Sequence, residues 1–294
     1  MRAMKAKFTL ENPMPPVWMM CPHIRQFSIG WRMGYGEGYK YDLSDWLDTL
    51  TETEKEKYQK MFPHPKTWRE YYNPDYDFVD MEDYQCGGVV LWNKHGIMEY
   101  SRNKLIEKYN SREQIEYIFF WKPNIGVVDK SCFGQWQPSV FSVDVDTYCC
   151  AEQYMMSEKA RFFKDEEICK LIMKSTDPEE MKALGKKVRN FEQNMWDKVK
   201  YSIVLNGNYF KFAQNEDMRN FLFSTGDKVL VEASPLDTVW GTGLSENNEK
   251  SQNPSTWRGQ NLLGFALMEV RDDLRNVYRN YDKIDWSMFK VVKI

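Results

Sequence analysis

The chain has 294 residues, of which 42% are hydrophobic and 15% aromatic, and its formal net charge is −3. This composition excludes a disordered chain, and the negative charge excludes a global basic field for nucleic acid, so any such contact must be local. The six cysteines form no CxxC pair and there are only three histidines, so no zinc-ligand spacing is present. Without a signal-peptide pattern or an apolar run of 18 residues, we expect a reduced, soluble, cytoplasmic protein and no membrane contact.

The first 114 residues are rich in aromatic side chains and carry no chemical motif. Gly34, Gly36 and Gly38 are predicted to lie in a loop, because no strand precedes them as a dinucleotide-binding fingerprint requires. Thr51-Glu-Thr-Glu54 predicts the start of a helix with a capping box. The role of this part stays open between gating a site, docking a partner and extending the core.

From residue 115 the pattern changes to short strands and amphipathic helices. Strands are predicted at 115–121, 140–148 and 229–233. Helices are predicted around 148–160, 165–173, 177–188, 190–205, 217–223 and 262–281. Asn206-Gly207 is expected to end the helix of residues 190–205.

Glu152 and Lys159 are seven residues apart in the helix around 148–160, so they return to nearly the same face after two turns. A lysine side chain points toward the helix N-terminus, and the ammonium could therefore approach the carboxylate across an axial gap of about 10 Å. The pair could form a site, or it could be an exposed ion pair without function, which is the commoner case.

The loop from Asp237 to Gly243 follows the strand at 229–233. Gly241 and Gly243 would let a ligand approach the main chain, and Trp240 offers a stacking face. A glycine-rich turn in which Asp237 caps a neighbouring backbone group explains the same residues equally well.

A series of motifs in the second part of the chain, taken together, resembles the NADAR family. The motifs are Glu152-Gln-Tyr-Met-x-x-x-Lys159-Ala, Asp177-Pro with Gly185 beyond, Phe191-x-x-x-x-Trp196, Lys211-Phe-x-Gln-Asn215, Thr225-Gly226, Glu232-Ala-Ser-Pro-x-Asp237-x-x-Trp240-Gly-x-Gly243 and Trp257-x-Gly-x-Asn261-x-Leu-Gly264-x-x-Leu-Met268-x-x-Arg271. The resemblance covers about residues 117–275. It implies a helix-rich α+β fold with a few short strands, in a catalytic domain of residues 115–294 that follows an extension of residues 1–114.

The activity that the resemblance implies is cleavage of an N-glycosidic bond to ribose, with no metal and no cofactor. The preferred hypothesis is removal of ADP-ribose from guanine in single-stranded or flipped-out nucleic acid. One alternative is hydrolysis of a ribosylamino-pyrimidine phosphate of riboflavin biosynthesis, a small-molecule substrate. Another is a binding module that recognises ADP-ribose or NAD without turnover.

The resemblance also implies the site residues. Glu152 would move a proton to the base or activate water, Asp237 would stabilise the developing cation, and Lys159 could form a Schiff base with a ring-opened ribosylamine. The expected substrate-binding residues are Phe119, Phe120, Lys186, Trp196, Lys211, Trp240, Gly241, Gly243, Asn261 and Arg271. Two departures are visible. Gly185-Lys186 replaces the usual Gly-Arg and loses the bidentate fork, and Phe133-Gly134-Gln135 stands where a Ser or Asn is expected.

Overall fold

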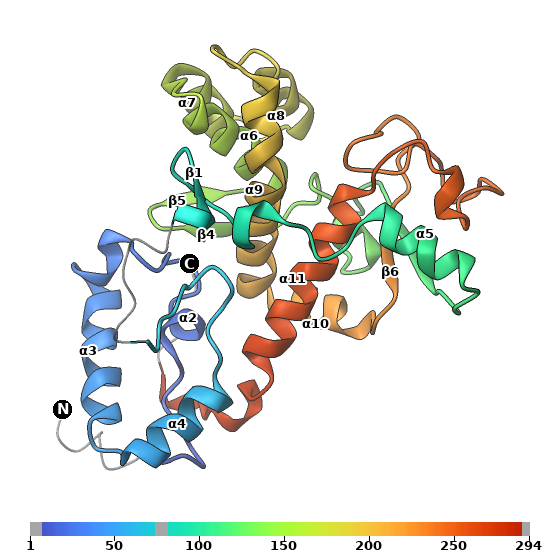
Figure 1. Cartoon of the computed structure of the whole chain (residues 1–294). Coiled ribbons are helices and arrows are strands. Elements are labelled where there is room, and N and C mark those ends of the chain that lie inside the picture. The colour runs from blue at the N-terminus through green and yellow to red at the C-terminus, as the bar shows by residue number, and fades with distance from the viewer. Residues whose placement is uncertain (1–7, 74–81, 290–294) are drawn as a thin grey trace. The chain divides into compact units, whose positions relative to one another are not determined.

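A computed structural model describes residues 8–73 and 82–289 and divides the chain into two compact units (Figure 1). The first unit takes its described residues from 1–76, 142–147 and 273–294, and the second takes them from 77–141 and 148–272. Residues 82–114 therefore lie in the same unit as the segment from residue 115 onward, whereas the sequence predicted a boundary between residues 114 and 115.

The first unit is built from short helices. They are α2 (Val17–Met20), η1 (Ile29–Trp31), α3 (Tyr35–Leu47), α4 (Glu52–Met61), η6 (Tyr281–Lys283) and η7 (Trp286–Met288). The predicted capping box is confirmed, since Thr51 and Glu54 each accept a hydrogen bond from the other's backbone N–H. The predicted loop is wrong beyond Gly34, because Gly36 and Gly38 lie in α3. At Gly36 a side chain would come within 2.7 Å of the Gly30 carbonyl oxygen, so this glycine permits close packing.

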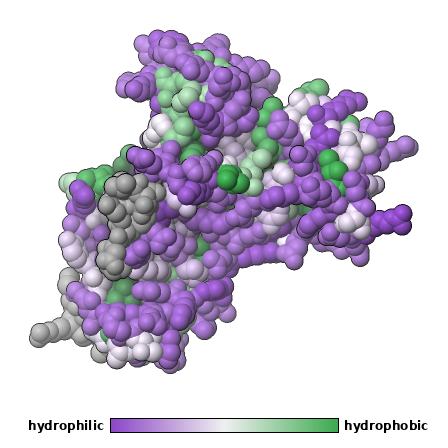
Figure 2. All heavy atoms as spheres, viewed as in Figure 1, coloured by the Kyte–Doolittle hydropathy of each residue, from purple (hydrophilic) through white to green (hydrophobic). Residues whose placement is uncertain are grey.

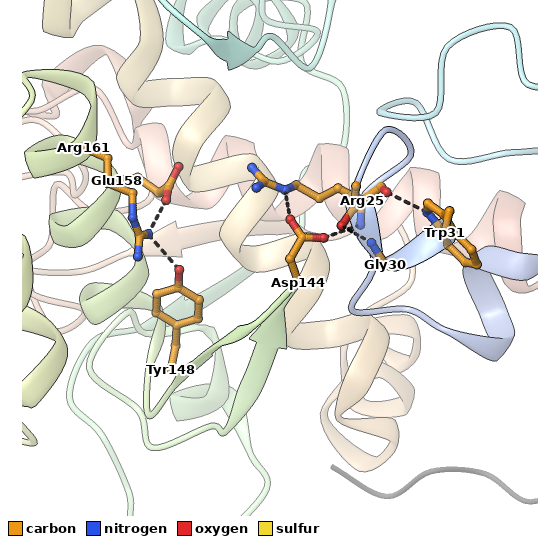
Figure 3. Close-up of polar contacts among 8 residues, drawn as sticks. Arg25, Gly30, Trp31, Asp144, Tyr148, Glu158 and Arg161 are labelled. Atoms are coloured by element: carbon orange, nitrogen blue, oxygen red, sulfur yellow. Dashed lines mark hydrogen bonds and ion pairs between the residues drawn. The ribbon is translucent and has the colours of Figure 1, made fainter. Parts of the chain in front are cut away.

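The segment 140–148 is a hairpin and not the single predicted strand. Its strands are β4 (Phe141–Val143) and β5 (Asp146–Tyr148), and Asp144 turns the chain with a φ of 53°. The Asp144 carboxylate accepts hydrogen bonds from the Arg25 side chain at 2.6 Å and from the Arg25 backbone N–H at 3.1 Å (Figure 3). An aspartate tolerates this backbone conformation better than most residues. The alternating pattern of residues 140–148 continues through the turn and therefore did not reveal it.

The second unit contains most of the helices and the parallel strand pair. Its elements are β1 (Gln85–Cys86), β2 (Val89–Val90), η3 (Lys94–Gly96), α5 (Arg102–Asn110), β3 (Tyr117–Phe120), η4 (Lys130–Phe133), α6 (Ala151–Phe162), α7 (Glu166–Lys174), α8 (Pro178–Gly185), α9 (Gln193–Gln214), α10 (Glu216–Ser224), β6 (Val229–Glu232) and η5 (Pro254–Thr256). The long helix α11 (Leu262–Tyr278) follows them. The predicted helix-rich α+β class with few short strands is confirmed.

Helix α6 is the centre of a helical cluster in the second unit. It packs against α7, α8 and α9, and α7 also packs against α8 (Figure 1). On α6, Arg161 donates to the hydroxyl of Tyr148 at 2.9 Å and to the carboxylate of Glu158 at 2.6 Å (Figure 3). The contact with Tyr148 ties α6, which carries Glu152 and Lys159, to β5, while the contact with Glu158 lies within the helix.

Helix α9 runs through Asn206-Gly207, where the sequence predicted its end. The Gly207 position is buried, and a Cβ there would lie 2.6 Å from Cδ1 of Tyr154. The glycine therefore permits α6 and α9 to approach closely, and the intact helix shows that this role prevailed over its low helix propensity.

The parallel pair β3–β6 aligns Phe120 with Glu232 at the ends of the two strands. Asn261 connects β6 to the start of α11, because its side chain accepts from the Glu232 N–H at 2.9 Å and donates to the Leu230 carbonyl oxygen at 3.0 Å. At Gly264 a Cβ would lie only 2.0 Å from the same Leu230 oxygen. The end of β6 is thus held at a fixed position against α11.

The surface seen in Figure 2 is mostly hydrophilic, with apolar residues in separate small patches, in line with a mean hydropathy of −0.67. Among residues 8–73 and 82–289, no helix combines the length and apolar composition needed to cross a membrane.

Candidate active site

The second unit contains a pocket of about 800 Å³. Six of the predicted site residues line it, namely Glu152, Lys159, Lys186, Trp196, Asp237 and Trp240. The other lining residues that matter for its chemistry are Trp121, Lys122, Trp136, Lys182, Phe191, Lys200 and Glu232. A pocket of this size, with aromatic walls and a few polar groups, is suited to a ligand of nucleotide size.

Glu152 lies on the pocket wall in the first turn of α6, and its residue is only 3% exposed. Its backbone N–H donates to the Gln135 carbonyl oxygen at 3.0 Å, and its Oε1 atom has no hydrogen-bond partner among the described residues. Burial raises the pKa of Glu152 to about 7, against the opposing effects of the Lys182 charge and a hydrogen bond with Trp136. A carboxyl group that titrates near neutrality can both accept and give a proton.

Gly134 and Gln135, which lie beside the Glu152 N–H, are held in place by α9. Lys211 donates from its ammonium to the Gly134 carbonyl oxygen at 3.0 Å, and Asn208 donates to the Gln135 side chain at 3.1 Å. Lys211 is fully buried, which lowers its pKa to about 8, and it does not line the pocket. The sequence predicted a contact between Lys211 and substrate, and in the structure its ammonium contacts the protein.

Asp237 caps a turn, which is one of the two interpretations that the sequence left open. Its Oδ1 atom accepts hydrogen bonds from the N–H groups of Val239 at 2.9 Å and Trp240 at 2.8 Å, as a turn-capping aspartate does. The same residue lines the pocket. The capping contacts orient the carboxylate, so the turn and the site are one structure.

Glu232 is a site residue that the sequence analysis did not select, although it was part of the quoted motif. It ends β6, lines the pocket, and its Oε2 atom is shielded from solvent without a partner among the described residues. Burial, followed by the negative charges of Asp237 and Glu152, raises the pKa of Glu232 to about 8, while the Lys182 charge opposes the rise. The available signal was its place at the carboxyl end of a parallel strand, where ligand sites of α/β proteins gather.

Lys159 does not form the predicted approach to Glu152. Its ammonium donates to the Gly185 carbonyl oxygen at 2.9 Å and lies 4.1 Å from the ring centroid of Phe191 and 5.6 Å from that of Trp196. Burial lowers the pKa of Lys159, which favours the uncharged amine that a nucleophile needs. The cation whose field reaches Glu152 is Lys182 on α8, which lies 5.8 Å from the Trp136 ring.

The remaining predicted binding residues do not line the pocket. They are Phe119, Phe120, Gly241, Gly243, Asn261 and Arg271. The two phenylalanines are buried on β3, and Gly241 lies so close to β6 that a Cβ would be 2.9 Å from the Glu232 carbonyl oxygen. Arg271 is buried on α11 and donates to Thr225 and to the Lys228 carbonyl oxygen. These residues build the frame of the site.

Comparison with known proteins gives one matching family and several similar proteins. The family model of the NADAR domain matches residues 119–275. An N-glycosidase of Acanthamoeba polyphaga mimivirus is 40% identical over 166 residues, which cover 55% of this chain and 98% of the viral protein. An N-glycosidase of Nostoc punctiforme is 34% identical over 50% of this chain and 86% of its own length. The N-glycosidase YbiA of Escherichia coli is 27% identical over 53% of this chain and 88% of its own length.

Proposed function

The chain belongs to the NADAR domain family, and from this premise we propose that its pocket hydrolyses an N-glycosidic bond to ribose. Three similar proteins carry the name N-glycosidase. The observation that supports the proposal most strongly is Glu152, a buried carboxyl group on the pocket wall with one unpartnered oxygen atom and a pKa raised by burial to about 7.

Heterolysis of the bond between C1 and the nitrogen leaves positive charge on C1 and the ring oxygen of ribose. A carboxylate in a pocket from which water is largely excluded stabilises that charge more strongly than one in bulk water. Asp237 has this role in the proposal, because its turn contacts hold its carboxylate on the pocket wall before substrate arrives. Water then attacks C1 through its oxygen atom, and Glu152 takes a proton from that water as the bond forms.

Lys159 offers a covalent route for substrates whose ribose ring opens. A ribosylamine in its open form carries an imine at C1, and a neutral lysine amine can add there and displace the leaving amine, which departs as the free amine. The lysine–C1 Schiff base is then hydrolysed by water. The lowered pKa of Lys159 and its apolar surroundings at Phe191 and Trp196 support this role.

The substrate that we propose is ADP-ribose linked to a guanine base of nucleic acid, in a single strand or flipped out of a duplex. Two features of the pocket support a substrate with bases and phosphates. Aromatic rings line it at Trp121, Trp136, Trp196 and Trp240, and ammonium groups line it at Lys122, Lys182, Lys186 and Lys200. Indole faces stack on bases and ammonium groups neutralise phosphates.

A substrate panel tests the proposal. The protein is incubated with an oligonucleotide that carries guanine-linked ADP-ribose, and separately with a ribosylamino-pyrimidine phosphate, and the products are identified by mass spectrometry. We expect the first substrate to yield unmodified guanine in the oligonucleotide and free ADP-ribose. Release only from the second would move the assignment to the smaller substrate, and release from neither would contradict N-glycosidase activity on these two classes.

A further inference from the structure

Hydrogen bonds fix the backbone of Glu232 on both its N–H and its carbonyl oxygen, at the end of β6. Its N–H donates to the Asn261 side chain at 2.9 Å, and its carbonyl oxygen accepts from the Thr242 N–H at 3.0 Å. Gly241 leaves room for this contact, since a Cβ there would lie 2.9 Å from the Glu232 oxygen. The side chain is therefore projected from a rigid base toward the pocket that it lines.

The carboxyl group of Glu232 is in an environment that favours its neutral form. Its Oε2 atom is buried and unpartnered among the described residues, and a buried polar atom without a partner is a candidate for a contact made only with ligand. Burial, followed by the charges of Asp237 and Glu152, raises its pKa to about 8, while Lys182 opposes this rise. Burial raises the pKa of Glu152 as well, to about 7. Both buried carboxyl groups can therefore hold a proton near neutral pH, which general acid and general base catalysis require.

We propose that Glu232 is the proton donor to the leaving nitrogen, acting together with Glu152 as the base that activates water. This role rests on the proposed N-glycosidase function. As the C1–N bond breaks, its electron pair goes to the nitrogen, which takes the proton from the Glu232 carboxyl group. Water bonds to C1 through oxygen and gives one proton to Glu152. Solvent then returns a proton to Glu232 and removes one from Glu152, so no other reactant is consumed.

The charged groups around Glu232 define what its titration depends on. The ones that act on it directly are Asp237 from the following loop, Glu152 from α6 and Lys182 from α8. The other ammonium groups that line the pocket are Lys122, Lys159, Lys186 and Lys200. A substrate that carries phosphates would pair with these ammonium groups and leave the proton on Glu232.

The first test compares pH–rate profiles of wild type and Glu232→Gln with the ADP-ribosylated guanine oligonucleotide. For wild type, kcat/KM should rise as Glu152 ionises near pH 7 and fall as Glu232 ionises near pH 8, as apparent values of the coupled pair. Glu232→Gln should lower kcat by about 10²- to 10⁴-fold and lose the alkaline limb, while KM changes little. Full activity of the variant, or an unchanged alkaline limb, would overturn the proposal.

The second test needs no turnover. Protein labelled with ¹³C at the glutamate carboxyl carbons is titrated by NMR, and the resonance absent from Glu232→Gln is assigned to Glu232. We expect that resonance to report a protonated carboxyl at pH 7 and to titrate above the Glu152 resonance. An ionised Glu232 at pH 7 would overturn the role even in an active enzyme. If the NMR result is as expected but wild type releases no product, the proposed function fails.

Discussion

The Glu152 carboxyl group is buried, and its Oε1 atom has no partner among residues 8–73 and 82–289. Its pKa is about 7 in the folded protein and its ordinary value is 4.5, so the folded state holds the proton more tightly than the unfolded state does. Stability from this group is therefore fully present below about pH 4.5 and is lost as the pH rises through about 7. Site residues often carry such a cost because function requires it.

We predict that Glu152→Gln makes the protein more stable at pH 8 and nearly unchanged at pH 4.5. The amide cannot ionise, so the variant avoids a penalty on the order of 2–3 kcal/mol at the higher pH. Urea unfolding at the two pH values measures the difference. Glu249→Gln, at an exposed position, is the control and should leave stability unchanged at both values. Equal stabilities of wild type and Glu152→Gln at pH 8 would refute this prediction.

Lys159 gives a second prediction at the residue scale. If its amine attacks C1 of a ring-opened ribosylamine, borohydride added during turnover reduces the Schiff base to a stable secondary amine. Peptide mass spectrometry should find this adduct on Lys159, and Lys159→Arg should show none because a guanidinium stays protonated. Lys182→Arg is the matched control and should keep the adduct. An unmodified Lys159 in a sample that turns substrate over would count against the covalent route.

At the residue scale, the series of motifs in the sequence selected Glu152, Lys159 and Asp237, and all three line one pocket. The charge of a side chain did not predict which other residues line the pocket, because burial decides what a cationic side chain contacts. Arg271 was predicted to bind substrate, but it is buried and its Nη1 donates to the Thr225 hydroxyl and the Lys228 carbonyl oxygen. Lys182 was not selected because its relation to Glu152 depends on how α8 packs on α6, which no local pattern encodes.

At the scale of elements, some glycines within helices permit close packing against a neighbouring element. We predict that Gly207→Ala destabilises the protein, because a Cβ would meet the Tyr154 ring at 2.6 Å. Overpacking costs about 1–3 kcal/mol, against a gain of about 1 kcal/mol from helix propensity. Gly38→Ala is the control, since it lies in α3 with no atom within 4 Å of a Cβ, and it should stabilise slightly. Thermal unfolding compares the two, and a Gly207→Ala protein as stable as Gly38→Ala would contradict the packing role.

Helix starts were predictable because their signals are local. The predicted Thr51 capping box is present, and Asp165 and Asp177 cap the two helices whose starts were predicted at residues 165 and 177. The continuation of α9 through Gly207 and the turn at Asp144 were not predictable. They depend on Tyr154 and Arg25, which are distant in sequence and become neighbours only in the folded chain.

For the whole molecule, residues 82–114 are part of the unit that holds the pocket. One of their links to α11 is Glu269, whose buried carboxylate accepts from the Asn93 side chain at 2.9 Å and the Glu99 N–H at 2.8 Å, and also from the Tyr201 hydroxyl of α9 at 2.9 Å. The sequence could not show this, because the contact joins positions more than 150 residues apart and the family resemblance begins only after them.

We therefore predict that Glu269→Ala lowers the free energy of unfolding by about 2 kcal/mol, since it leaves the buried Tyr201 hydroxyl and two half-buried donors without this acceptor. Hydrogen exchange should increase at residues 93–99 before it increases in α6. Glu249→Ala, at an exposed position, serves as the control and should change stability by less than about 0.5 kcal/mol. Unchanged exchange at residues 93–99 would show that Glu269 does not hold this segment.

The most direct test of the proposed N-glycosidase function compares ligand binding and turnover in wild type and Glu152→Gln. Free ADP-ribose is titrated against both proteins by thermal shift, and release of ADP-ribose from the guanine-linked oligonucleotide is followed by mass spectrometry. We expect both proteins to bind ADP-ribose and only wild type to release it. Equal release by both proteins would place the chemistry elsewhere, and binding by both without release by wild type would identify a binding module in place of an enzyme.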